Sequence, residues 1–126
     1  MIFPTFVDHL VFRVAELDRT ERFYTALLGQ PAQRAEASVM YKAGDTRLFF
    51  TRADQPQEGS YEKEKVGLNH IAFGVRTLQD LQAMQEQLGI AGLPHSGIKQ
   101  DKYGMKDFIW LDGPDGLRIE FYMRPL

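Results

Sequence analysis

The stretches VDHLVFRV (residues 7–14) and LNHIAFGV (residues 68–75) decide the fold, because they are two copies of one pattern. His70 follows His9 by 61 positions, and the apolar residues after the two histidines match at the same offset. In each copy apolar residues alternate with others, which is the two-residue period of a half-buried β-strand. The sequence therefore predicts an internal repeat whose copies each begin with a strand carrying a histidine opposite its apolar face.

A helix is expected after each of these strands. Apolar residues recur there every three or four positions, as on one face of an amphipathic helix. They are Phe23, Leu27 and Leu28 in the first copy, and Leu78, Leu81, Met84 and Leu88 in the second. Asp18 and Thr77 are the expected N-caps, each with an acidic residue three positions later, and Gly29 and Gly89 are the expected helix ends.

Short strands are expected after each helix, separated by turns rich in Gly, Asp and Pro. They cover residues 38–42 and 47–52 in the first copy, and 108–111 and 117–123 in the second. The predicted fold class is α+β, with two strand–helix–strands modules whose uncovered sheet faces line a shared cup. A single domain over residues 1–126 is expected, with module one at about 5–53, a polar linker at about 54–66 and module two at about 67–124.

Composition excludes several classes of function. The 126 residues contain no cysteine, which removes disulfides, thiolate nucleophiles and cysteine-type zinc sites. The net charge of −2 lacks the basic excess of a nucleic-acid-binding protein. No apolar run is long enough to span a bilayer, and no secretory signal pattern is visible. The expected compartment is the cytoplasm, and the expected partner is a small molecule rather than nucleic acid or a membrane.

The predicted metal ligands are His9, His70 and Glu120. The last strand alternates so that Arg118, Glu120 and Tyr122 share one face, opposite its apolar residues. A carboxylate in such a strand needs a cation nearby or must become neutral. One histidine in an apolar strand is more often a buried structural residue. Two at matching positions of a repeat, together with a strand carboxylate, favour a metal site.

Two imidazoles and one carboxylate suit one divalent first-row metal ion and leave coordination positions open for a substrate. Fe²⁺ is the first expectation, because it would also allow oxygen activation. Zn²⁺, Mn²⁺, Ni²⁺ and Co²⁺ accept the same donors.

The same residues resemble the vicinal-oxygen-chelate superfamily, which includes glyoxalase I, extradiol dioxygenases, fosfomycin-resistance thiol transferases, methylmalonyl-CoA epimerase and bleomycin-binding proteins. The motifs that carry the resemblance are residues 8–14, 23–29, 69–73 and 115–120, so it spans nearly the whole chain. It implies two βαβββ modules that form a curved, mainly antiparallel sheet around a metal-binding cup. It also implies metal ligands at the three residues chosen above, and often a homodimer.

The resemblance also suggests which branches fit. Phe49 stands where glyoxalase I has a fourth ligand, a glutamate, so the three-ligand branches match better. Extradiol dioxygenases usually carry a tyrosine where Trp110 stands, and they use a second histidine for proton transfer. His95 is the remaining histidine and Tyr103 could supply a phenol, so both are candidate catalytic residues. Each could equally be an ordinary loop residue. For the fosfomycin-type branch, no polar cluster that would hold potassium and a phosphonate is evident.

Substrate-binding residues are also expected on the predicted cup face. They are Phe49, Trp110 and Tyr122 as pocket walls, with Arg47 and Arg118 as possible contacts for an anionic substrate. Solvated or ion-paired arginines are the alternative for the last two.

The expected function is a divalent-metal-dependent enzyme that chelates a small substrate through vicinal oxygens, with a dioxygenase-like reaction the first to test. One alternative is a metal-independent drug-sequestering protein of the bleomycin-resistance type. Another is a lyase or thiol transferase on the same scaffold. A scaffold protein that binds other proteins has no positive support in the sequence.

Overall fold

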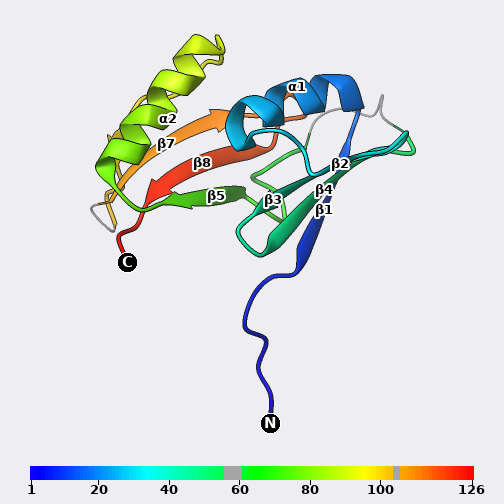
Figure 1. Cartoon of the computed structure of the whole chain (residues 1–126), viewed down its shortest axis with the longest axis horizontal. Coiled ribbons are helices and arrows are strands. Elements are labelled where there is room, and N and C mark those ends of the chain that lie inside the picture. The colour runs from blue at the N-terminus through cyan, green and yellow to red at the C-terminus, as the bar shows by residue number, and fades with distance from the viewer. Residues whose placement is uncertain (56–60, 104–105) are drawn as a thin grey trace. The chain divides into compact units, whose positions relative to one another are not determined.

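The chain forms two compact units, Met1–Gly59 and Ser60–Leu126. This computed structural model describes residues 1–55, 61–103 and 106–126 (Figure 1). Part of the predicted linker, residues 56–60, lies outside the described residues. Each unit has its own sheet and its own helix, so the repeat seen in the sequence is also a repeat of structure.

The first unit contains one helix and a four-stranded sheet. Its elements are β1 (His9–Val14), α1 (Leu17–Leu28), β2 (Gln33–Arg34), β3 (Ser38–Ala43) and β4 (Thr46–Arg52). The sheet order is β1-β4-β3-β2. β1 pairs in parallel with β4, whereas the other two pairs are antiparallel.

The second unit repeats this arrangement. Its elements are β5 (His70–Val75), α2 (Leu78–Ile90), β6 (Lys99–Gln100), β7 (Asp107–Asp112) and β8 (Arg118–Met123). The sheet order is β5-β8-β7-β6, again with one parallel pair, β5 with β8, and two antiparallel pairs. The predicted α+β class and the paired βαβββ modules are therefore confirmed. The two-residue strands β2 and β6 were not predicted individually.

One face of each sheet is buried. In β4, Leu48 and Phe50 are almost fully buried, and the ring of Tyr24 from α1 lies 4.1 Å from that of Phe50. In β8, Ile119 and Phe121 are buried in the same way. Because side chains alternate along a strand, the opposite face of each sheet is left to the histidines and their neighbours.

The N-terminus of α2 is as predicted, whereas that of α1 is not. Thr77 caps α2, since its hydroxyl accepts a hydrogen bond of 3.0 Å from the Asp80 amide. In α1 the N-cap is Glu16, without a side-chain cap, and Asp18 lies in the first turn. Leu17 is buried, so the helix begins there, and Asp18 forms an ion pair with Arg34 instead.

The C-terminus of α1 is as predicted, and that of α2 is later than predicted. Gly29 ends α1 with a positive φ of 84°. Gly89 lies inside α2, and the residue with positive φ is Gly92, at 71°. The Gly92 amide donates to the Gly89 carbonyl and the Leu93 amide to the Leu88 carbonyl, which is the Schellman pattern. The expectation that Gly89 ends the helix was therefore wrong by three residues.

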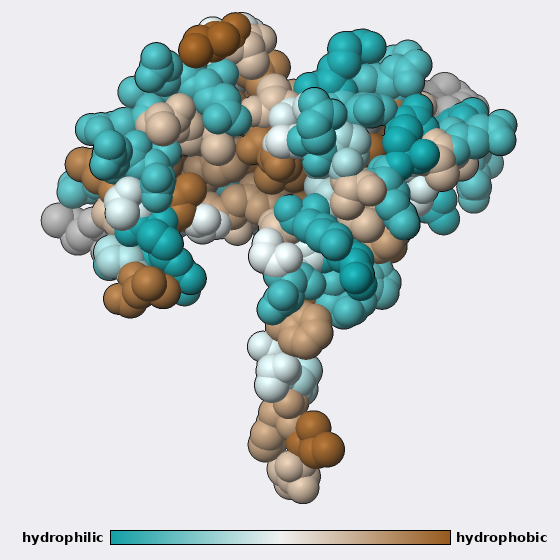
Figure 2. All heavy atoms as spheres, in the orientation of Figure 1, coloured by the Kyte–Doolittle hydropathy of each residue, from teal (hydrophilic) through white to brown (hydrophobic). Residues whose placement is uncertain are grey.

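The segment before β1 carries several exposed apolar side chains, which Figure 2 shows along the N-terminal end of the chain. They are Met1, Ile2, Phe3, Phe6 and Val7. Neither helix in the described residues is long and apolar enough to cross a membrane.

Two leucines of α2 give a test of the second unit's core. Leu81 is fully buried, whereas Leu78 is 43% exposed. We expect Leu81→Ala to lower the free energy of unfolding by about 2–5 kcal/mol, because it leaves a cavity. Leu78→Ala, the matched control, should cost about 1 kcal/mol or less. Urea denaturation followed by circular dichroism measures both, and equal losses would contradict this assignment of the core.

Candidate metal site

His70 and Glu120 lie on one face of the second unit's sheet. β5 and β8 pair in parallel with His70 opposite Arg118 and Ala72 opposite Glu120, so the two candidate ligands are diagonal neighbours. The Nε2 atom of His70 is 3.6 Å from Oε1 of Glu120. That separation is too long for a hydrogen bond. It is close to the roughly 3–3.5 Å that separates two ligand atoms each about 2.1 Å from one ion.

The ring of His70 is oriented by the residue before it. Nδ1 of His70 lies 2.8 Å from Oδ1 of Asn69. The Asn69 amide nitrogen donates to the Lys63 carbonyl at 3.0 Å, which turns its oxygen toward the histidine as an acceptor. Nδ1 of His70 therefore carries the hydrogen. In the neutral ring, the lone pair of Nε2 then faces Glu120.

His9 has the matching arrangement in the first unit. Its Nδ1 atom lies 2.7 Å from Oδ2 of Asp8, a carboxylate that accepts the N–H hydrogen bond. The Nε2 atom is again left available. The ring of Phe49 meets the His9 ring edge-on, at 5.8 Å between centroids and 84° between planes.

Glu120 is the least exposed of the three candidate ligands, with its side chain 15% accessible. Among the described residues its carboxylate has no hydrogen-bond donor, and His70 is its neighbour at 3.6 Å. A carboxylate so placed is costly unless a cation balances it. The donor set, an imidazole nitrogen beside a carboxylate, therefore fits a divalent metal ion.

The structure brings two of the three predicted ligands together. In residues 1–55, 61–103 and 106–126, no group of three or more histidine, cysteine or acidic side chains is gathered closely enough to hold a metal ion. His70 and Glu120 are neighbours in the second unit, and His9 belongs to the first. The three-residue metal site stays a prediction.

Arg118 and Trp110 contact each other on the same face as Glu120. The guanidinium of Arg118 lies 3.9 Å above the Trp110 ring, and its Nε atom is 2.6 Å from Oδ1 of Asp112. The register explains both contacts, because Trp110 pairs with Glu120 and Asp112 pairs with Arg118. Arg118 is thus already ion-paired within its own sheet.

Tyr122 continues this face of β8. Its hydroxyl donates a hydrogen bond to the Asp101 carboxylate, and its ring stacks on that of Phe108. The hydrogen bond to Asp101, followed by burial, raises the pKa of Tyr122 to about 12. Tyr122 is therefore a neutral phenol near pH 7.

The two predicted catalytic residues, Tyr103 and His95, form local contacts and no hydrogen bond to His70 or Glu120 among the described residues. Tyr103 is an exposed side chain whose ring contacts the Lys102 ammonium group. The residue after it lies outside the described residues. His95 accepts a hydrogen bond at Nδ1 from the Gly97 amide, 2.9 Å away, so the neutral ring carries its proton on Nε2.

Backbone pairing locates His95 relative to β7. Ser96 and Trp110 form two hydrogen bonds, from the Ser96 amide to the Trp110 carbonyl and from the Trp110 amide to Oγ of Ser96. The His95 turn therefore lies along the side of β7 opposite β8. Glu120 on β8 is two strand spacings from Ser96, on the order of 10 Å.

Sequence reasoning missed the residues that orient the predicted ligands. Asp8 and Asn69 stand immediately before the two histidines, at matching positions of the repeat, and both offer an oxygen acceptor. That match was visible in the sequence. The partners Asp101 and Asp112 depend on strand register and loop path, which the sequence pattern does not give.

Known proteins of the same fold are numerous, and several cover nearly the whole chain. The chain is 29% identical to the uncharacterized protein YaeR of Escherichia coli strain K12, over 92% of this chain and 94% of that protein. A putative glyoxalase from Bacillus halodurans superposes with a TM-score of 0.80 at 22% identity, covering 94% and 95% of the two chains. The fosfomycin resistance protein FosX from Mesorhizobium loti superposes with a TM-score of 0.70 at 19% identity, covering 99% and 96%.

A family model also matches residues 6–121, from the segment before β1 to the middle of β8. That span includes both histidine strands and Glu120. The chain therefore belongs to the Glyoxalase/Bleomycin resistance protein/Dioxygenase superfamily.

Proposed function

We propose that this chain is an enzyme that holds one divalent metal ion with His9, His70 and Glu120 and acts on a small substrate through two neighbouring oxygens. The observation that carries the proposal is the largely buried Glu120 carboxylate. It has no hydrogen-bond donor among the described residues, and it lies 3.6 Å from an available histidine nitrogen. A cation between these two atoms would satisfy both.

The chemistry of the histidines supports the same proposal. A histidine must be neutral at the nitrogen that binds metal, and a hydrogen bond at the other nitrogen fixes the ring. Asp8 and Asn69 supply that hydrogen-bond acceptor to His9 and His70. Fe²⁺ is the first ion to test, and Zn²⁺, Mn²⁺, Ni²⁺ and Co²⁺ suit the same donors. When bound, the ion would act as a Lewis acid that stabilises an anion forming on the substrate oxygens.

A dioxygenase-like reaction is the first to assay. Phe49 pairs with Val11 just as Glu120 pairs with Ala72, so a phenyl ring replaces a carboxylate at the matching position of the first unit. A three-ligand site leaves more positions for substrate and oxygen than a four-ligand site. Isomerase, lyase and thiol-transfer reactions are the alternatives. Tyr122, whose hydroxyl proton is engaged by Asp101, would form part of the pocket wall, and His95 and Tyr103 remain predicted proton-transfer residues.

Metal content is the decisive test. We expect anaerobically purified protein to hold nearly one metal ion per chain, and His70→Ala and Glu120→Ala to lose it, because each removes one donor. His95→Ala is the matched control and should keep the ion. Elemental analysis measures the metal, and circular dichroism checks that each variant is folded.

Two outcomes would contradict the metal site. One is retention of metal by both ligand variants. The other is a wild-type protein that binds none of the five candidate ions after reconstitution. Either outcome would favour the metal-independent, ligand-sequestering alternative.

Asn69 is expected to act as a positioning residue for His70. Asn69→Leu removes the acceptor of the Nδ1–H hydrogen bond and should weaken metal affinity about 10–100-fold. Asn69→Asp keeps an acceptor and should retain most of the affinity. Competition between the protein and a chromophoric chelator for Co²⁺ measures both. The role is refuted by equal losses in the two variants or by no loss in Asn69→Leu.

The ligands could come from one chain or from two copies in a homodimer, and mixed variants distinguish these arrangements. Co-expressed His9→Ala and His70→Ala chains should bind no metal if each site uses a single chain. If a dimer shares its sites, random pairing should restore about a quarter of them. Elemental analysis of the purified mixture gives the answer, with each variant expressed alone as the control.

A further inference from the structure

In both units an arginine on one strand pairs with the histidine of the neighbouring strand. The residue that pairs with this arginine on its other side is basic in the first unit and acidic in the second. In the first unit the row of paired residues is His9, Arg47 and Lys42, and in the second it is His70, Arg118 and Asp112. Residues paired across neighbouring strands share a face of the sheet, so each row is a set of neighbours. The repeat therefore supplies an internal comparison between two otherwise matching sites.

In the second unit the arginine is neutralised. Arg118 forms an ion pair with Asp112 at 2.6 Å and stacks on Trp110 at 3.9 Å. Its charge is thus balanced within the sheet.

In the first unit the acidic partner is replaced by a lysine. Lys42 and Arg47 are both exposed, and within the described residues neither side chain has an ion pair or a hydrogen bond. Like charges directly opposite on neighbouring strands destabilise a sheet. An anion bound between them would offset that repulsion.

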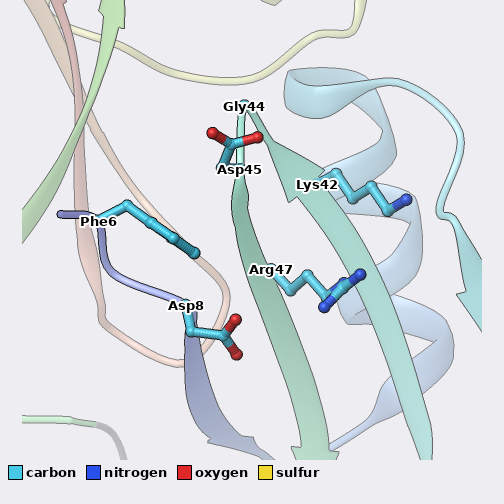
Figure 3. A pocket seen from close by; sticks show the side chains of 6 residues that line it. All are labelled: Phe6, Asp8, Lys42, Gly44, Asp45 and Arg47. Carbon is cyan, nitrogen blue, oxygen red and sulfur yellow. The ribbon is translucent and has the colours of Figure 1, made fainter. Parts of the chain in front are cut away.

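A pocket of about 390 Å³ lies at these two side chains. Its lining residues are Phe6, Asp8, Lys42, Gly44, Asp45 and Arg47. Figure 3 shows Lys42 and Arg47 extending to the same side from neighbouring strands. Phe6 adds an apolar wall. A planar guanidinium beside a flexible ammonium group is a combination that binds a carboxylate or a phosphate.

We propose that Lys42 and Arg47 form a subsite for an oxyanion group, a carboxylate or a phosphate, on the substrate. The substrate would then be a small organic acid or phosphate ester with its chelating oxygens at the other end. This inference deepens the proposed function and rests on it, because only an enzyme would have a substrate to bind here. Arg47 pairs directly with His9, so the subsite begins one strand spacing, about 5 Å, from a proposed metal ligand.

The acidic residues of the pocket limit the charge of the ligand that it can bind. Asp8 is engaged with His9, and Asp45 lies in the turn between β3 and β4. Both carboxylates would repel additional negative charge. The pocket therefore suits a single anionic group and disfavours a polyphosphate or a nucleic-acid backbone.

The test is titration of the metal-free protein with inorganic phosphate and, separately, with acetate. Backbone amide chemical shifts of residues 42–47 report binding. We expect saturable shifts that weaken with added salt, and affinity about tenfold lower or worse in Arg47→Gln and Lys42→Gln. Arg52→Gln is the matched control, because Arg52 is an exposed arginine of the same strand that does not line the pocket.

The subsite is supported if either probe gives saturable shifts in the wild-type protein and both variants abolish or strongly weaken them. The probe that binds more tightly identifies the oxyanion. No saturable shift at residues 42–47, or shifts that the two variants leave unchanged, overturns it. Metal content of the same variants, which should stay at the wild-type level, tests the proposed function independently. Anion binding without any metal binding would refute the enzyme proposal and leave the subsite standing.

Discussion

The parallel pairing of the first and last strands in each unit is the constraint on which the rest of the structure depends. β1 pairs with β4 and β5 with β8, and such pairs need a crossover that a helix supplies. The helix buries one face of the sheet and leaves the other open. Because side chains alternate with a period of two, a slip of one residue would exchange the faces. Core packing by Leu48 or Ile119 thus also fixes where His9 and Glu120 point.

The two copies of the module have kept this frame and diverged at matching positions of the open face. Glu120 in one copy corresponds to Phe49 in the other, and Asp112 corresponds to Lys42. At these matching positions the second unit has acidic side chains, whereas in the first unit Lys42 and its neighbour Arg47 form no ion pair among the described residues. In the proposed enzyme this divergence gives the two copies different roles. The carboxylate ligand belongs to one copy, and the oxyanion subsite belongs to the other.

The sequence patterns predicted the strands, the repeat and the fold class because burial of one face of a strand or helix imposes a regular spacing of apolar residues in the sequence. They did not predict β2 and β6, since two residues cannot display a period. The helix ends were harder because neighbouring residues compete for the same role. Gly89 is a plausible stop, yet the Schellman hydrogen bonds form one turn later, around Gly92. Burial of Leu17 likewise decides the start of α1 over the capping pattern of Asp18.

For the candidate site, alternation gives the face of a residue but not its neighbour on the next strand. The faces of His70, Arg118 and Glu120 were therefore predictable, whereas the ion pair between Arg118 and Asp112 was not. Arg47 and Arg118 hold matching places in the repeat and cannot be told apart by pattern. Only the register reveals that one faces a carboxylate and the other a lysine. Since a guanidinium without an ion pair is available to a ligand, the register also distinguishes the ion-paired Arg118 from Arg47, the arginine of the proposed subsite, which forms no ion pair among the described residues.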